Sequence, residues 1–79
     1  MEKYARLIVK EGFWGKPVRD DLIAKTLILH NVDLKRTQMD VGFFNNTYTF
    51  VVCGEMSNII KAWNELRATR ELNVRLEEV

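Results

Sequence analysis

Residues 39–53 alternate large apolar and small or polar side chains on both sides of an Asn45–Asn46 pair. Alternation with a period of two residues is typical of a β-strand that has one buried face. Asparagine tolerates the positive φ angles of a tight turn, so the pair predicts a two-residue β-hairpin connection. In this register Phe43 faces Tyr48, and the large apolar residues of both strands share one face. The other facing pairs are Val41 with Phe50 and Met39 with Val52.

Four further segments have the periodicity of regular elements. Alternating apolar and polar residues predict strands over residues 4–10 and 72–77. Apolar residues spaced three and four apart predict helices over about residues 18–30 and 57–68. Asn31 is expected to end the first helix in the left-handed conformation. The predicted element order is therefore β-α-β-β-α-β.

Two strand–helix–strand units joined by a hairpin close into a four-stranded antiparallel sheet. Right-handed crossovers place both helices on the same face of that sheet. The sequence thus predicts an α+β fold, a ferredoxin-like βαββαβ sandwich with strand order 4-1-3-2, as a single domain over residues 1–79. The predicted core consists of Leu7, Val9, Leu22, Ile23, Leu27, Met39, Val41, Phe43, Tyr48, Phe50, Val52, Ile59, Ile60, Trp63, Val74 and Leu76.

Composition narrows the class of protein. The chain has 79 residues, of which 47% are hydrophobic and 29% charged, and this is ordinary for one small globular domain. No apolar run approaches the ~20 residues needed to cross a bilayer, and the charged N-terminus lacks the pattern of a signal peptide. We therefore expect a cytoplasmic protein without membrane contact. The net charge of +1 lacks the basic excess typical of proteins that bind duplex nucleic acid.

The chain offers few residues for catalysis. His30 is the only histidine, and we expect it to cover the core at the end of the first helix; a catalytic or ligand role is the alternative. Cys53 is expected to pack as a small apolar residue, with a reactive thiol beside the second helix as the alternative. Asp20 and Asp21 point about 100° apart on a helix, so they do not converge on one metal ion. The sequence predicts no enzyme, with no catalytic residue, cofactor or metal site.

Three features are candidates for binding. Phe13 and Trp14 lie between glycines, where they either contact a partner or fold back over the open end of the core. The sheet face opposite the helices is mildly apolar at its middle, and it is either solvated or the contact face of a partner, a second copy or nucleic acid. Basic residues are scattered over the chain as solvated charges or as contacts to phosphate. The residues predicted on the open face are Tyr4, Arg6, Ile8, Asp40, Phe44, Thr47, Thr49, Val51, Asn73 and Arg75.

The βαββαβ order and the segment Asn46-Thr47-Tyr48-Thr49-Phe50-Val51-Val52-Cys53 resemble an RNA-recognition motif, in particular the divergent form at the C-terminus of some DEAD-box helicases. In that family two aromatic residues of the third strand stack unpaired bases on the open sheet face. The resemblance places Tyr48 and Phe50 at those positions. The usual Lys/Arg-Gly opening is Asn46-Thr47 here, and the first strand offers no matching aromatic residue. Exposing both rings would also move the apolar residues of the hairpin into water at ~1.5–3 kcal/mol each, so we expect both rings to face the helices.

A second resemblance lies at the end of the third strand. The turn Val52-Cys53-Gly54-Glu55-Met56, followed by Ile59-Ile60-Lys61-Ala62, is similar to a strand–turn–helix junction of bacterial microcompartment shell domains. The stretch between the second helix and the last strand is short for that fold.

These features favour a small protein–protein interaction module, which would act as an adaptor, regulator or inhibitor of a larger protein or would associate with itself as a dimer. Its expected contact residues are Phe13, Trp14, Ile8, Phe44 and Val51. The alternative is a single-stranded RNA- or DNA-binding domain of the RNA-recognition type. Its expected contact residues are Arg6, Lys35, Arg36 and Arg75.

Overall fold

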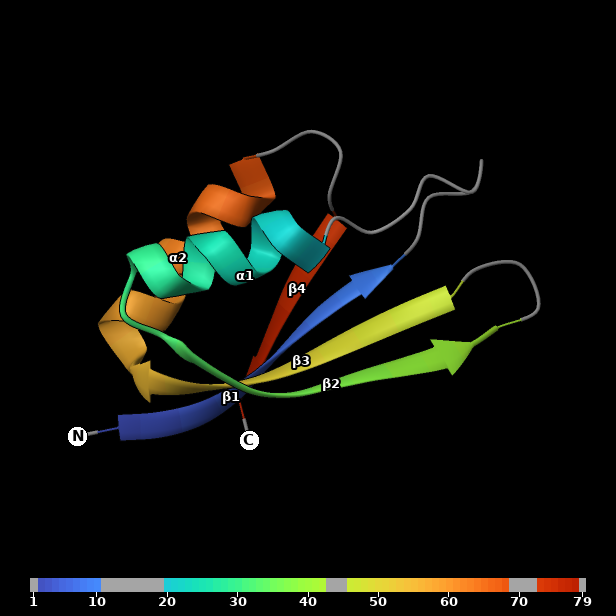
Figure 1. Cartoon of the computed structure of the whole chain (residues 1–79), viewed down its shortest axis with the longest axis horizontal. Coiled ribbons are helices and arrows are strands. Elements are labelled where there is room, and N and C mark those ends of the chain that lie inside the picture. Colours follow the sequence, from blue (N-terminus) through green and yellow to red (C-terminus); the bar gives the residue numbers. More distant parts are fainter. Residues whose placement is uncertain (1, 11–19, 43–45, 69–72, 79) are drawn as a thin grey trace.

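The structure is a computed structural model that describes residues 2–10, 20–42, 46–68 and 73–78 (Figure 1). Its strands and helices follow one another in the predicted βαββαβ order. They are β1 (Glu2–Lys10), α1 (Asp20–Leu29), β2 (Asp33–Val41), β3 (Asn46–Glu55), α2 (Met56–Ala68) and β4 (Asn73–Glu78).

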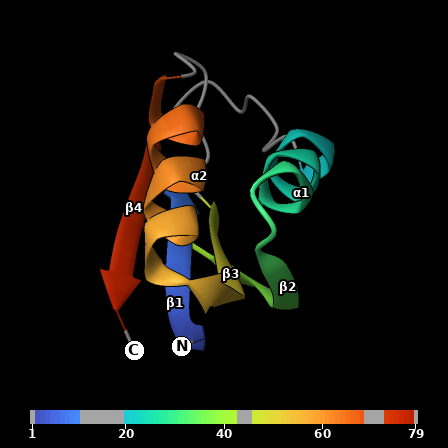
Figure 2. The ribbon, with the colours of Figure 1, turned by 90° about the vertical axis from the view of Figure 1, so that its left-hand side faces the viewer.

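The four strands form one antiparallel sheet in the order β2-β3-β1-β4, which is the predicted order 4-1-3-2 counted from the other edge. Both helices lie on one face of this sheet (Figure 1). The end-on view shows α1 over the β2 side and α2 over the β1 and β4 side (Figure 2). Contacts agree with this view, because α1 touches β2 whereas α2 touches β1, β3 and β4. The predicted α+β ferredoxin-like sandwich is confirmed, with one sheet face left open.

The core lies between the helices and alternate residues of the strands. Phe50 is 1% exposed and pairs with Leu7, which is fully buried, so the predicted inward direction of the Phe50 ring is confirmed. Tyr48 is half-buried and packs against the same core. The buried apolar cluster consists of Ala5, Leu7, Val9, Ile23, Leu27, Val32, Phe50, Val52, Ile59, Ala62, Leu66 and Val74.

The predicted register of the central hairpin is wrong. Tyr48 pairs with Met39 instead of Phe43, and Val41 pairs with Asn46, so the connection is longer than two asparagines. Along the regular part of the ladder, from Arg36 to Val41, the partner of each β3 residue is displaced by four positions along β2. Because side chains alternate between faces with a period of two, this even displacement leaves the residues of that part on their predicted faces.

Three residues predicted in the core are exposed instead: Met39 is 50% exposed, Val41 is 78% exposed and Ile60 is 39% exposed. The first two follow from the lengths of the elements. The ten residues of α1 rise about 15 Å, whereas the ten residues of β3 extend about 33 Å. The β2–β3 hairpin therefore reaches beyond the helices (Figure 1), and its far end is uncovered on the helix side. The predicted core residue Phe43 lies outside the described residues.

Asn31 ends α1 as predicted, with a φ of 57°. Its backbone N–H donates to the Ile28 carbonyl at 3.1 Å, and the N–H of Val32 donates to the Leu27 carbonyl at 2.8 Å. These are the two hydrogen bonds of a Schellman motif. The motif turns the chain directly from α1 into β2 and buries Val32 against the core. It thus fixes where α1 lies relative to the β2 edge of the sheet.

Candidate functional site

The strand register defines the open face of the sheet. Ile8 of β1 pairs with Thr49 of β3. Arg6 pairs with Val51 in the neighbouring position, and facing residues of antiparallel strands point to the same side. Ile8 and Val51 are therefore diagonal neighbours, half-buried at the middle of the open face. The other described residues that were expected on this face also lie on it: Tyr4, Asp40, Thr47, Asn73 and Arg75.

The predicted partner-contact residues divide into two groups. Ile8 and Val51 form a small apolar patch at the centre of the open face. Phe13, Trp14 and Phe44 lie outside the described residues. A contact through these three aromatic residues stays a prediction.

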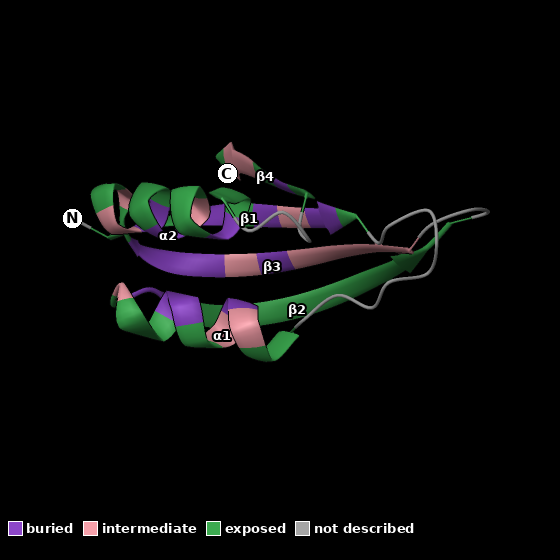
Figure 3. Ribbon diagram, turned by 90° about the horizontal axis from the view of Figure 1, so that it is seen from above, coloured by how far each residue is buried: buried purple, intermediate pink, exposed green. Residues whose placement is uncertain are grey.

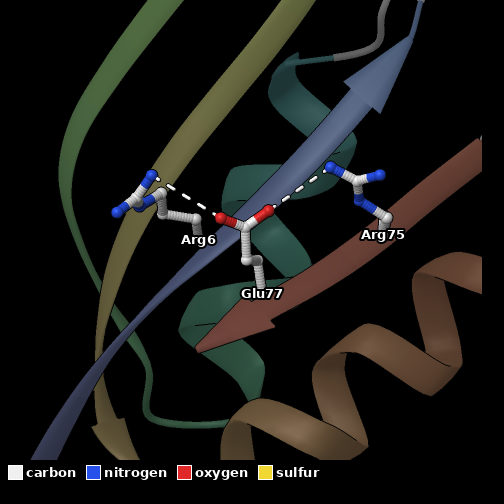
Figure 4. A network of polar contacts seen from close by, with 3 residues as sticks. All are labelled: Arg6, Arg75 and Glu77. Carbon is white, nitrogen blue, oxygen red and sulfur yellow. Dashed lines mark hydrogen bonds and ion pairs between the residues drawn. The ribbon is translucent and has the colours of Figure 1, made fainter. Parts of the chain in front are cut away.

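Two of the basic residues predicted for nucleic acid lie beside the Ile8–Val51 patch and share one carboxylate (Figure 4). Arg6 is 3.7 Å from one oxygen of Glu77, and Arg75 donates to the other oxygen at 3.3 Å. All three side chains are at least two-fifths exposed, so each contact stabilises the fold by about 1 kcal/mol or less. The arrangement matters more for recognition, because Glu77 offsets part of the positive charge that an approaching phosphate would meet.

A shallow hollow lies next to these residues, between β1 and β4. Its volume is about 190 Å³, and it is lined by Ile8, Lys10, Asn73 and Arg75. Pockets that bury a drug-sized ligand usually have volumes of roughly 300–1,000 Å³. The hollow is thus too small to enclose such a molecule, but its two cationic side chains fit a single anionic group at the surface.

The most exposed element of the fold is the edge strand β2. All nine of its residues are exposed (Figure 3). A bulge interrupts the pairing with β3 between Leu34 and Arg36, so Lys35 lies in the bulge. From Arg36 to Val41 the ladder is regular, with Arg36, Gln38 and Asp40 on the open face and Thr37, Met39 and Val41 on the helix side. We call residues 36–41 the β2 edge.

The opposite edge strand, β4, is shorter and partly covered. It has six residues, and the indole Nε1–H of Trp63 in α2 donates to the Val74 carbonyl of this strand at 2.9 Å. The guanidinium of Arg67 lies over the Trp63 ring, 4.4 Å from its centroid. Covering an edge is a common way to prevent it from pairing with another strand. The two edges of the sheet are therefore not equivalent.

Most of the exposed apolar residues described belong to α1 and β2. Among the described residues seven large apolar side chains are exposed, and only Tyr4 and Ile60 lie elsewhere. The other five belong to the end of α1 and to β2: Ile28, Leu29, Leu34, Met39 and Val41. The end-on view shows that α1 and β2 are adjacent on the same side of the molecule (Figure 2). The sequence predicted β2 as an edge strand but did not predict this surface, because it placed Met39 and Val41 in the core.

His30 and Cys53 have identifiable neighbours. The Nε2 of His30 contacts the carboxylate of Glu65, so this side chain joins the end of α1 to α2. The Cys53 side chain is buried, and its thiol donates to a Glu2 carboxylate oxygen 3.7 Å away. These contacts support structural roles for both residues, and the prediction that the chain has no enzymatic activity stays a prediction.

No protein-family profile matches the chain, and a comparison with curated proteins finds no similar sequence. Within the described ranges, no group of three or more His, Cys, Asp or Glu side chains is arranged to hold a metal ion. Neither of the two described helices is long and apolar enough to span a membrane. Functional arguments therefore rest on the surfaces of the fold, and above all on the open face and the β2 edge.

Proposed function

We propose that the chain is a protein–protein interaction module that binds its partner mainly through the β2 edge. The observation that carries this proposal is that β2 is a fully exposed edge strand, and that five of the seven exposed large apolar side chains described belong to it and to the neighbouring α1. Single apolar residues on a surface are normal, but a concentration of them beside one free edge favours an interaction site there. An exposed edge strand adds a row of backbone donors and acceptors that a partner strand can pair with.

The β2 edge has the chemistry of β-strand addition. In this binding mode an extended segment hydrogen-bonds to a free sheet edge, and alternate side chains supply specificity. Met39 and Val41 offer apolar contacts on the helix side of the edge, where the helices end. Arg36 and Asp40 offer charged contacts on the open side. Side chains on both faces of a partner strand would thus contact side chains of β2.

The Ile8–Val51 patch is the second contact surface of the proposal. It is central and half-buried, but charged residues surround it on β1, β2 and β4. Such a patch fits the edge of a larger interface better than its centre, because interface centres are depleted of charge. It would extend a contact made by β2 across the open face.

The test is capture of partners from a nuclease-treated lysate of the native cell, with Val41→Lys as the variant. Ile60→Lys is the matched control, because it places the same charge on another exposed apolar residue, in α2. Lysine on an edge strand opposes pairing, so V41K should lose at least tenfold in captured protein while I60K keeps it. Circular dichroism establishes that both variants are folded. Equal capture by both variants would remove β2 from the proposal.

The alternative function, binding of single-stranded nucleic acid, is favoured by one observation, the cationic hollow beside Arg75 and Lys10. Phe50 is buried and cannot stack on a base, so affinity would come mainly from phosphate contacts. Binding to labelled oligonucleotides should then fall steeply with salt and fall further in Lys10→Gln and Arg75→Gln. If binding were absent or did not depend on salt, the nucleic-acid alternative would be ruled out and the protein–protein proposal would stand by itself.

A further inference from the structure

We infer that the β2 edge pairs antiparallel with the β2 edge of a second copy of this chain, with Gln38 on the two-fold axis and Arg36 opposite Asp40 of the other copy. This inference rests on the proposed function, because it names the partner of the same edge. It is independent of the identity of any other protein that the chain binds.

Symmetry limits the registers that two copies can adopt. Two identical edge strands pair antiparallel about a two-fold axis normal to the sheet, and such an axis keeps each face of the sheet on its own side. Facing residues must therefore belong to the same face of the sheet. This holds only in registers in which one residue faces its own copy across the two-fold axis, and we describe that residue as lying on the axis. Along the β2 edge the central positions are Thr37, Gln38 and Met39.

Charge selects one of these three registers. With Gln38 on the axis, Arg36 of each copy faces Asp40 of the other, which gives two ion pairs of opposite sign. With Thr37 on the axis, Arg36 faces Gln38 instead. With Met39 on the axis, Asp40 faces Gln38. Opposite charges directly across a pair of strands stabilise the pairing, and they also fix its register.

The two charges are available for this contact. Both Arg36 and Asp40 are exposed, and they lie on the same face of one strand about 13 Å apart, too far to pair with each other. Within the described part of the chain, neither side chain takes part in an ion pair or a side-chain hydrogen bond. Each copy therefore presents one positive and one negative side chain along the edge. A two-fold axis reverses the direction of the second strand, so the positive group of one copy faces the negative group of the other.

The helix side of the same register buries apolar surface. Met39 faces Thr37 of the second copy and lies diagonally from the other Met39, which is within reach of a long side chain. The exposed Leu34 lies on the same strand, beyond the bulge. Both sheets would join into one eight-stranded sheet with all helices on one side. The bulge at Leu34–Arg36 would end the shared ladder at each end.

Reversing one charge at a time provides the main test. In Arg36→Asp two negative side chains face each other at both ends of the ladder, and in Asp40→Arg two positive side chains do. For each variant alone, the dimer dissociation constant measured by sedimentation velocity should be at least tenfold higher than that of the natural chain. An equimolar mixture of R36D and D40R should dimerise again, because every facing pair then joins opposite charges. Restoration by mixing also shows that both variants are folded.

Disulfide formation tests the register itself. Only a residue on the two-fold axis meets its own copy, so Gln38→Cys should cross-link under mild oxidation while Asp40→Cys should not. Facing Cα atoms of antiparallel strands lie about 4.5–5.5 Å apart, within the range that a disulfide spans. Both variants are made in a Cys53→Ala chain, so that the buried thiol does not contribute.

Three outcomes would overturn the inference: a natural chain that stays monomeric up to about 1 mM, a dimer that persists unchanged in both R36D and D40R, or cross-linking of D40C in place of Q38C. None of these decides the proposed function, which depends on the difference in capture between V41K and I60K. If V41K and I60K captured equal amounts of protein while the R36D–D40R mixture still dimerised, self-association would be the remaining role of the edge.

Discussion

Neighbouring residues of β3 determine what each face of the sheet can bind. Phe50 points to the helices and is buried, whereas Thr49 and Val51 point to the open face. Of the exposed large apolar residues described, Tyr4 of β1 is the one that adds an aromatic ring to the open face. The described part of this face, with one exposed ring and the shared carboxylate of Glu77, is poorly suited to stacking several unpaired bases. Residue by residue, the open face favours polar and aliphatic contacts.

The conformation of Asn31 can be tested by substitution, because its φ of 57° lies in the left-handed region. Replacement with glycine removes the side chain that this conformation disfavours, so Asn31→Gly should change the free energy of unfolding by less than about 1 kcal/mol. Asn31→Val forces a β-branched residue into the same conformation and should destabilise the fold by about 1–2 kcal/mol. Urea unfolding of the two variants measures the difference. Equal stability of N31G and N31V would show that the turn adopts another conformation in solution.

The lengths of the elements explain both what the sequence predicted and what it missed. Alternation along 39–53 gave the correct faces of the hairpin, because the face of a residue depends only on whether its position is odd or even. The facing pairs depended on the turn, and Asn45–Asn46 suggested a connection shorter than the one observed. Burial of Met39 and Val41 depended on how far α1 reaches, which periodicity within the strand does not encode.

The same limit applied to the candidate site. The predicted strand order already placed β2 at an edge, and alternation placed Ile8, Val51, Arg6 and Arg75 on the open face. The apolar surface beside β2 required the relative lengths of helix and strand in three dimensions. The contact of Arg6 with Glu77 required the register between β1 and β4, since these two residues are far apart in the sequence, whereas Arg75 lies two positions from Glu77 on the same strand.

The hydrogen bond that attaches α2 to β4 can be removed by a single substitution. Trp63→Phe keeps an aromatic ring beneath Arg67 but removes the Nε1–H that donates to the Val74 carbonyl. Because Trp63 is only half-buried, water can partly replace the lost donor, and the expected loss is about 1 kcal/mol of unfolding free energy. Chemical denaturation provides the measurement, with Lys61→Gln on the exposed side of the same helix as the control. A W63F protein as stable as the natural chain would show that this hydrogen bond does not hold the edge.

The sheet of the molecule is longer than the two helices that cover it. The helices lie over one end of the sheet, while the far end of the β2–β3 hairpin extends past them and β2 is exposed along its whole length (Figures 1 and 3). A chain of 79 residues buries only about 60–65% of the surface that its unfolded form exposes. Its stability as an isolated chain is correspondingly modest. Covering the β2 edge with a second copy would therefore add stability where the fold itself supplies least.

This coupling predicts a melting temperature that depends on protein concentration. Binding that occurs only in the folded state raises stability by mass action, so each tenfold rise in concentration should add about 1.4 kcal/mol to the unfolding of a dimer. For a dimer of chains this size, that increment corresponds to a shift of roughly 4 °C. Scanning calorimetry of the natural chain should show the shift, and R36D should lose most of it because its facing charges repel. An equimolar R36D and D40R mixture should recover the concentration dependence, whereas a melting temperature that is independent of concentration in all three samples would show that the fold reaches its full stability as a single chain.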